Sequence, residues 1–279
     1  MNAAVRWAAL AGAIACALIG FMYWSAVRQP VVRTARIAFA DWPSRDAAIQ
    51  VVFVADVHVA GPDMPPSRLA RIVDQINELE PDLVLLGGDF VSDKRTASAR
   101  YSAEKAVAPL ALLKARFGTV AVLGNHDHWR DARAIASALR KANVRLLDNS
   151  AITVGPLRIG GVDDAFTGRA DVTRTVAAIR SNPGARVILS HSPDIAPSLP
   201  TDVSLLLAGH THCGQIRLPF IGAISYMSDH GERFACGAMH EGSLRVITTA
   251  GLGTSILPLR LGTAPEIWSL RLGPTLSRP

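Results

Sequence analysis

Residues 119–127 read Thr-Val-Ala-Val-Leu-Gly-Asn-His-Asp, an apolar run that passes directly into polar residues. Residues 119–123 suit a buried β-strand. Gly124 then lets the backbone turn sharply, so that Asn125 and His126 are presented where the strand ends. Functional side chains at strand ends are expected of α/β sheets, whose ligands bind outside the carboxyl ends of the strands.

The same pattern recurs on both sides of this stretch. A valine-rich run over residues 48–55 ends at Asp56, and residues 82–86 run into Asp89 through two glycines. Apolar residues at helical spacing predict a helix through Leu69–Leu79, and further helices are expected over residues 103–115 and from near Asp131. After residue 150 short strands are predicted over residues 151–154, 157–162, 186–190, 204–208, 244–248 and 267–270, with a helix over residues 171–180. We therefore expect an α/β fold with a second sheet stacked on the first.

The first 45 residues differ in character from the rest. Residues 7–27 carry no charge, and a helix of that length can cross about 30 Å of hydrocarbon. We predict a retained membrane anchor over residues 1–28, a linker with a short extended piece over residues 29–45 and one catalytic domain over residues 46–273; the alternative for the first segment is a cleaved signal peptide. Basic residues on both flanks, Arg6 on one side and Arg28, Arg33 and Arg36 on the other, favour a cytoplasmic domain only weakly.

The charge and cysteine content of the chain indicate which classes of partner and of metal site to expect. The net charge is +6, which favours an anionic membrane surface or a phosphate-bearing substrate. The basic residues are dispersed and form no stripe with interleaved aromatic residues, so nucleic acid is not an expected partner. With only three cysteines, the chain has neither a disulfide framework nor a thiolate zinc cluster, although a single bridge between Cys213 and Cys236 is compatible with the sequence.

Five short motifs follow predicted strands in order. They are Asp56-Val57-His58, Gly88-Asp89, Gly124-Asn125-His126-Asp127, His191 and Gly209-His210-Thr211-His212. Strand alternation would bring Asp56 and His58 to one side of the chain, and would do the same for His210 and His212. Carboxylate, amide and imidazole donors together suit Mn²⁺, Fe or Zn²⁺ rather than Ca²⁺. Two such ions about 3.5–4 Å apart can activate a hydroxide for attack on phosphorus.

This ordered set resembles the calcineurin-like metallophosphoesterase superfamily, and its loops 214–219 and 251–262 resemble the YkuE-like membrane-associated bacterial branch. The resemblance implies a four-layer α/β/β/α sandwich of two stacked mixed β-sheets flanked by helices. It also implies Asp56, His58 and His212 at one metal, Asn125, His191 and His210 at the other, and Asp89 bridging them. His126 would act on the leaving oxygen, and Asp127 would orient its loop.

One departure from a related pattern concerns the partner of His126. Protein serine/threonine phosphatases continue the second motif as GDxxDRG, whereas this chain has Ser92 at the place of the second carboxylate and Asp93 one residue later. Either Asp93 swings in to pair with His126, or His126 is oriented differently. His128, His230 and His240 are interpreted as structural, and Asp163 and Asp164 as turn residues.

The expected activity is metal-dependent hydrolysis of a phosphomonoester, phosphodiester or pyrophosphate. The substrate would be a phosphorylated small molecule or a lipid-linked one, met by a single-pass protein of the bacterial inner membrane. Two alternatives are a UDP-2,3-diacylglucosamine pyrophosphatase, which requires a cytoplasmic active site, and a membrane-tethered binding module without turnover.

Overall fold

A computed structural model describes residues 2–43 and 46–275 of the chain. Its first sheet has six strands in the order β1 (Val31–Phe39), β14 (Glu266–Pro274), β2 (Ile49–Val54), β3 (Leu83–Leu86), β4 (Thr119–Ala121) and β5 (Val144–Leu146). From β2 to β5 the strands are parallel, and β14 pairs antiparallel with β2. The sheet is therefore mixed, with its parallel part next to the functional loops.

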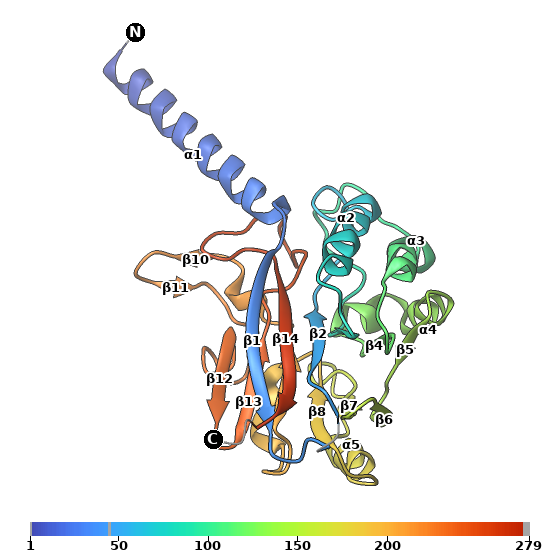
Figure 1. Ribbon diagram of the computed structural model, residues 1–279. Helices are drawn as coiled ribbons and strands as arrows, with labels where there is room; N and C mark the ends of the chain where they lie inside the picture. The colour runs from blue at the N-terminus through green and yellow to red at the C-terminus, as the bar shows by residue number, and fades with distance from the viewer. Residues whose placement is uncertain (1, 44–45, 276–279) are drawn as a thin grey trace.

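The second sheet also has six strands and is also mixed. Its order is β12 (Gly237–Glu241), β13 (Leu244–Thr248), β9 (Leu205–Ala208), β8 (Ala185–Leu189), β7 (Leu157–Gly161) and β6 (Ser150–Val154). The four central strands are parallel, and the two outer pairs are antiparallel. Figure 1 shows the two sheets together with the helices that flank them.

The apolar residues sort into three cores, one for each interface between layers. In β2, Val52 and Val54 belong to the core beneath α2 (Pro66–Asn77), α3 (Ala103–Val107) and α4 (Asn125–Lys141), whereas Val51 and Phe53 face the second sheet. The alternation follows from the two-residue period of a strand. A third core lies between the second sheet and α5 (Val172–Ile179) with the short helix η2 (Pro193–Ser198). The predicted four-layer sandwich is confirmed.

An isolated helix, α1 (Ala3–Val27), precedes the sandwich. Its 25 residues give a length of about 37 Å, enough to cross a bilayer. Most of its surface is exposed, and only Met22, Ser25 and Ala26 near its end are buried against the rest of the chain. The length and composition suit the predicted membrane helix.

The structure refines three expectations about element boundaries. The short extended piece expected in the linker is strand β1, which pairs along its full length with β14. The sequence did not predict this pairing at the edge of the sheet. The helix expected from near Asp131 is present, because the backbone leaves helical angles at Asp131 and its carboxylate accepts from the backbone N–H of Ala134. A helical segment that begins at Asn125 precedes it within α4. The helix expected over residues 103–115 is shorter, because Pro109 begins a separate 3₁₀ turn, η1 (Ala108–Leu112).

Candidate metal centre

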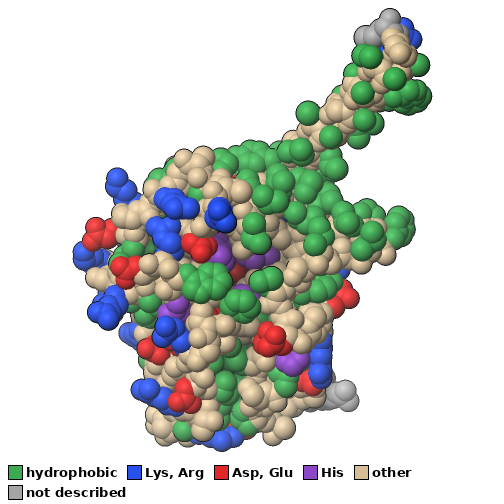
Figure 2. Space-filling model, turned by 180° about the vertical axis from the view of Figure 1, so that it is seen from behind, with side chains coloured by type: hydrophobic (Ala, Val, Ile, Leu, Met, Phe, Trp, Pro, Cys, Tyr) green, Lys and Arg blue, Asp and Glu red, His purple; other side chains and the backbone are tan. Residues whose placement is uncertain are grey.

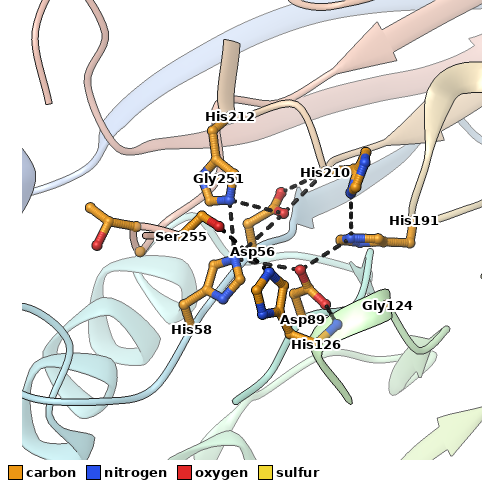
Figure 3. A network of polar contacts seen from close by, with 12 residues as sticks. Asp56, His58, Asp89, Gly124, His126, His191, His210, His212, Gly251 and Ser255 are labelled. Atoms are coloured by element: carbon orange, nitrogen blue, oxygen red, sulfur yellow. Dashed lines mark hydrogen bonds and ion pairs between the residues drawn. The ribbon is translucent and has the colours of Figure 1, made fainter. Parts of the chain in front are cut away.

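The predicted site residues converge where the carboxyl ends of strands from both sheets meet. Asp56 and His58 follow β2, Asp89 follows β3, and Asn125 and His126 follow β4. The second sheet contributes His191 after β8, with His210 and His212 after β9. Figure 3 shows the aspartate and histidine side chains of this set directed toward one another across the junction of the two sheets. All eight predicted residues are thus brought together.

The backbone reaches this arrangement by a route the sequence did not predict. The residues with left-handed backbone angles include five of the eight, with φ between 50° and 68°: Asp56, His58, Asp89, His210 and His212. None of the five lies within a strand, so the expectation that strand alternation aligns Asp56 with His58 and His210 with His212 is wrong. Non-glycine residues in this region cost roughly 1–3 kcal/mol each and cluster at functional sites. The strain is tolerated because the tight turns aim all five side chains inward.

The first cluster of donors consists of Asp56, His58 and His212. The two imidazoles face each other through Nε2 atoms 3.0 Å apart. The Oδ1 atom of Asp56 lies 3.5 Å from Nε2 of His212 and 4.0 Å from Nε2 of His58. All three side chains are buried, so the cluster can hold one cation away from bulk water.

The second cluster contains Asn125, His191 and His210. The Oδ1 atom of Asn125 lies 3.0 Å from both Nε2 of His191 and Nδ1 of His210. Asp89 stands between the two clusters, because its Oδ2 atom lies 3.4 Å from Nε2 of His58 and 3.2 Å from Nε2 of His191. Its position is that of a carboxylate shared by two sites.

Donor spacing tests whether a metal fits. Bonds of about 2.0–2.1 Å from a metal to nitrogen place neighbouring ligand atoms about 3.0–3.4 Å apart. Most of the separations between donor atoms within the two clusters fall close to that range, from 3.0 to 3.5 Å. Each cluster therefore has the dimensions of a coordination shell.

The hydrogen bonds of His191 also support a cation at the site. Nδ1 of His191 lies 2.8 Å from the carbonyl oxygen of Gly87 and can donate to it. In the neutral ring this leaves the Nε2 lone pair facing the oxygens of Asp89 and Asn125, which are acceptors as well. A proton on Nε2 or a metal ion can reconcile acceptors that face one another. A carbonyl partner at the other ring nitrogen, as Gly87 is here, is typical of an imidazole that binds metal.

The electrostatic field of the site is consistent with a cation there. Burial alone would lower the pKa of His191, but Asp89 and Asp56 raise it to about 10. Burial also raises the pKa of Asp89, yet His191 and His58 outweigh it and hold that pKa well below the usual range. Without a metal, a proton on His191 supplies the positive charge. The carboxylates that attract this proton would attract a metal ion as well.

The remaining imidazoles are suited to act as neutral ligands. Burial lowers the pKa values of His58 and His212, and burial together with His191 lowers that of His210 to about 4. All three rings are therefore neutral near pH 7, the state in which a histidine binds metal. Among the residues that the structure describes, one ring nitrogen of each has no hydrogen-bond partner.

Glycines allow the loops to approach the carboxylates closely. A Cβ atom placed on Gly209 would lie 2.3 Å from Oδ2 of Asp56, and one on Gly124 would lie 2.4 Å from Oδ1 of Asp89. Neither position leaves space for alanine. These glycines let the carboxylates of Asp56 and Asp89 pack against the neighbouring loops.

We expect Gly209→Ala to damage both the site and the fold. The added methyl group would displace Asp56 and destabilise the metal-free protein by about 1–3 kcal/mol, the usual cost of overpacking. Thermal unfolding and metal content measure the two effects. Gly12→Ala, where a Cβ meets nothing within 4 Å, is the matched control. Unchanged metal content and melting temperature in Gly209→Ala would contradict this role of Gly209.

His126 pairs with Asp93, which settles the alternative left open by the sequence. Nδ1 of His126 contacts Oδ1 of Asp93, so the carboxylate one residue beyond Ser92 has swung in. The Oγ atom of Ser92 instead accepts from the backbone N–H of Lys94. On the other side of the ring, Nε2 of His126 lies 3.5 Å from Oγ of Ser255. The ring is held at one nitrogen and presents the other to the site (Figure 3).

Asp127 performs the orienting role that was expected of it. Its carboxylate accepts hydrogen bonds from the backbone N–H groups of Asp89, Phe90 and Gly124. The loop after β3 and the start of α4 are thereby tied together. The backbone N–H of His126 in turn donates to Oδ1 of Asp89 at 2.9 Å, which joins the start of α4 to the carboxylate between the two clusters.

Several residues at the site were not predicted from the sequence. Ser255 belongs to the loop after β13, whose glycines at 251 and 253 had been noted only for their resemblance. Trp129 and Phe166 form an exposed aromatic rim: their rings lie 4.9 Å from the His126 ring and 4.7 Å from the His210 ring, respectively. Neither aromatic residue stands in a motif, so only the folded chain reveals the rim.

The remaining polar residues have structural roles. His128 pairs with Asp163 at 2.8 Å, and Asp164 accepts from the backbone N–H groups of the following turn. These contacts confirm the structural interpretation of His128 and the turn assignment of Asp164. Cys213 forms a disulfide with Cys236, the bridge that the sequence left open.

Residues 49–214 match the family model described as calcineurin-like phosphoesterase. The chain belongs to this family. It is 35% identical to the uncharacterized metallophosphoesterase YkuE of Bacillus subtilis (strain 168), over 71% of this chain and 70% of that protein. It is 31% identical to the phosphodiesterase YaeI of Escherichia coli (strain K12), over 85% and 86% of the two chains. Calcineurin-like phosphoesterases use divalent metals, which agrees with the donor clusters.

A vertebrate relative bears on the apolar helix. The chain is 29% identical to a transmembrane protein with metallophosphoesterase domain from Danio rerio, over 96% of this chain and 63% of that protein. Together with α1, this similarity indicates that the phosphoesterase is associated with a membrane.

Proposed function

We propose that the protein hydrolyses phosphoester bonds, most readily phosphodiesters, with two divalent metal ions. Asp56, His58 and His212 would hold one ion and Asn125, His191 and His210 the other. The observation that carries the proposal is the position of Asp89, whose Oδ2 atom lies within 3.4 Å of a histidine from each cluster. A metal pair supplies Lewis acidity and an activated water nucleophile in such a site.

The protein's own residues would complete the chemistry around the metals. The Nε2 atom of His126 would give a proton to the leaving oxygen. The contact of Asp93 with Nδ1 supports this role, because it fixes the ring. Ser255, 3.5 Å from the same nitrogen, would orient it further. Retention of His126 and of every predicted metal ligand argues for turnover and against a non-catalytic binding module.

The test is hydrolysis of bis(p-nitrophenyl) phosphate by the purified full-length protein in detergent. We expect activity that needs added Mn²⁺, disappears with a chelator and returns when the metal is restored. Metal analysis should give two ions per chain at saturation. Absence of hydrolysis under all divalent metals, or hydrolysis that a chelator leaves unchanged, would contradict the proposal.

We also propose that the catalytic domain faces an oxidising compartment outside the cytoplasm. The disulfide between Cys213 and Cys236 supports this orientation, because such bonds rarely persist in the cytosol. The basic flanks of α1 favour the opposite side only weakly. An outward site argues against the UDP-2,3-diacylglucosamine pyrophosphatase alternative, which needs a cytoplasmic one.

We therefore expect thiol chemistry and topology reporters to agree. Unreduced, denatured protein taken from cells should react with a maleimide only at Cys16, which is outside the disulfide, and reduction should expose Cys213 and Cys236 as well. Alkaline phosphatase fused after residue 279 should be active, and green fluorescent protein at the same place should stay dark. Three free thiols together with a fluorescent fusion would place the domain in the cytoplasm.

A further inference from the structure

The most exposed apolar side chains of the sandwich gather beside the foot of α1. The hairpin formed by β10 (Arg217–Leu218) and β11 (Gly222–Ala223) carries Phe220, which is fully exposed, and Ile221, which is 77% exposed. Ile256 in the neighbouring loop is 68% exposed. We call this cluster the apolar apron: Leu218, Phe220, Ile221, Ile224, Ile256 and Leu257.

The apron lies on the side of the molecule from which α1 emerges. In Figure 1 the β10–β11 hairpin projects on the side toward which α1 leans, whereas strand β14 ends at the opposite end of the molecule. Figure 2 shows hydrophobic side chains running from the foot of the helix toward a protruding lobe, with histidines in the hollow beside them. Water-exposed apolar surface of this kind is unfavourable unless a partner covers it.

The end of α1 fixes how the sandwich is held against the membrane. The carbonyl oxygen of Met22 accepts from the backbone N–H of Arg260 at 3.0 Å, and that of Ala26 accepts from Nη2 of Arg68 at 2.9 Å. Ser25 donates to the carbonyl oxygen of Thr263 at 3.2 Å. Because helix α2 and the loop between β13 and β14 hold the last turns of α1 through these hydrogen bonds, α1 is not a free tether. A bilayer spanned by α1 therefore meets one particular face of the sandwich.

Residues at the foot of α1 mark where the bilayer surface would lie. The Arg28 guanidinium lies 5.4 Å from the centre of the Trp24 ring, which is 54% exposed. Tryptophan and arginine at a helix end are typical of the boundary between lipid and water. The hairpin reaches toward this level, so its tip is placed to meet the headgroups and the first part of the acyl chains.

The apron is connected directly to the metal site. The disulfide of Cys213 closes the base of the loop that carries the hairpin, and Cys213 follows the predicted ligand His212. The side chain of Gln215 accepts from the backbone N–H of Ser255 at 2.9 Å and donates to the carbonyl oxygen of Leu257 at 3.0 Å. Both halves of the apron are thus joined to each other and to Ser255 beside His126.

We propose that the apolar apron dips into the bilayer spanned by α1 and seats the metal site at the headgroup layer. The partner is the lipid bilayer, because the apron continues the exposed apolar surface of a helix that itself suits a membrane. An amphiphilic substrate can then present its phosphoester to the metals while its apolar part stays in the membrane. This last step rests on the proposed phosphoesterase function, whereas the bilayer contact does not.

Depth of the apron in vesicles tests the contact. In a Cys16→Ala background the full-length protein is labelled with an environment-sensitive nitrobenzoxadiazole dye at Phe220→Cys or Ile221→Cys and placed in phosphatidylcholine–phosphatidylglycerol vesicles. We expect blue-shifted emission that nitroxide-labelled acyl chains quench, as at the reference Ile14→Cys within α1. The control Ser243→Cys, in the β12–β13 turn, should emit as in water. Water-like emission at the hairpin would overturn the proposal, as would a blue shift without quenching, which would indicate a second copy or another protein instead.

Activity separates the bilayer contact from the chemistry. The variant Phe220→Ser/Ile221→Ser/Ile224→Ser should hydrolyse soluble bis(p-nitrophenyl) phosphate at a rate within about twofold of wild type, because no changed residue touches the site. Its rate on a phosphodiester lipid embedded in vesicles should fall about tenfold. Leu112→Ser, at an exposed leucine on η1, should change neither rate. Equal loss on both substrates, or on neither, would overturn the seating of the site by the apron. If the wild type did not hydrolyse the soluble ester, the proposed phosphoesterase function would be contradicted. The fluorescence measurement in vesicles would then still test whether the apron enters the bilayer.

Discussion

Asp89→Asn is expected to lower phosphodiester hydrolysis by about 10³-fold, equivalent to about 4 kcal/mol of transition-state stabilisation. The substitution keeps an oxygen for the backbone N–H of His126, which Oδ1 of Asp89 accepts at 2.9 Å. It removes the negative charge that lies between His58 and His191. Without that charge the two clusters of donors lose their shared anion, so both metals should bind more weakly.

Metal analysis at limiting Mn²⁺ and steady-state kinetics measure the two effects together. Asp163→Asn is the matched control, because Asp163 is a partly buried carboxylate that binds His128 and belongs to neither cluster. We expect the control to keep wild-type metal content and rate. Circular dichroism distinguishes a site defect from unfolding. An Asp89→Asn protein that folds, binds two metals and turns over normally would remove the central support for a shared carboxylate.

The sequence predicted those helices and strands in which apolar residues recur with the period of the element. The strands buried on both faces, such as β2 and β3, are recognisable in the sequence as continuous apolar runs that are followed by acidic residues. The edge strand β1 is not, because Arg33, Thr34 and Arg36 alternate with apolar residues at a sheet margin. Its partner β14 lies more than two hundred residues later, and no local pattern reports such a pairing.

The sequence predicted which residues form the candidate site, but not the backbone conformation that brings them together. Motif order places Asp56, His58 and the other donors at strand ends, and the structure gathers all of them. The left-handed turns that aim them are set by close packing of Gly124 and Gly209 against the carboxylates, which depends on loops meeting from two sheets. The orientation of His126 also depends on the folded loops. A helical segment that begins at Asn125 sets the direction of the His126 ring, so the sequence alone left its pairing with Asp93 open.

His126→Gln is expected to lower kcat by about 10²–10⁴-fold, the usual contribution of a positioned general acid. Its ring belongs to a third group of possible ligands with His58 and Asp89, so a metal role and a proton-transfer role make different predictions. If His126 acts on the leaving oxygen, the variant should keep its two metals and lose least on an ester of an acidic phenol, whose departure needs little help from a proton. Loss of metal to the extent seen in Asp89→Asn would make His126 a ligand instead.

His128→Gln is the matched control for this experiment, because it changes a histidine two residues along the same helix that pairs with Asp163. Asp93→Asn separates the chemistry of His126 from its positioning. Nδ1 of His126 would lose its carboxylate partner, so kcat should fall by about tenfold with a shifted pH profile, while KM and metal content stay near wild type. A fall in kcat without any change in the pH profile would mean that Asp93 supports only the loop. In the double variant His126→Gln/Asp93→Asn the second substitution should add almost nothing, because Asp93 acts through the ring that is already gone.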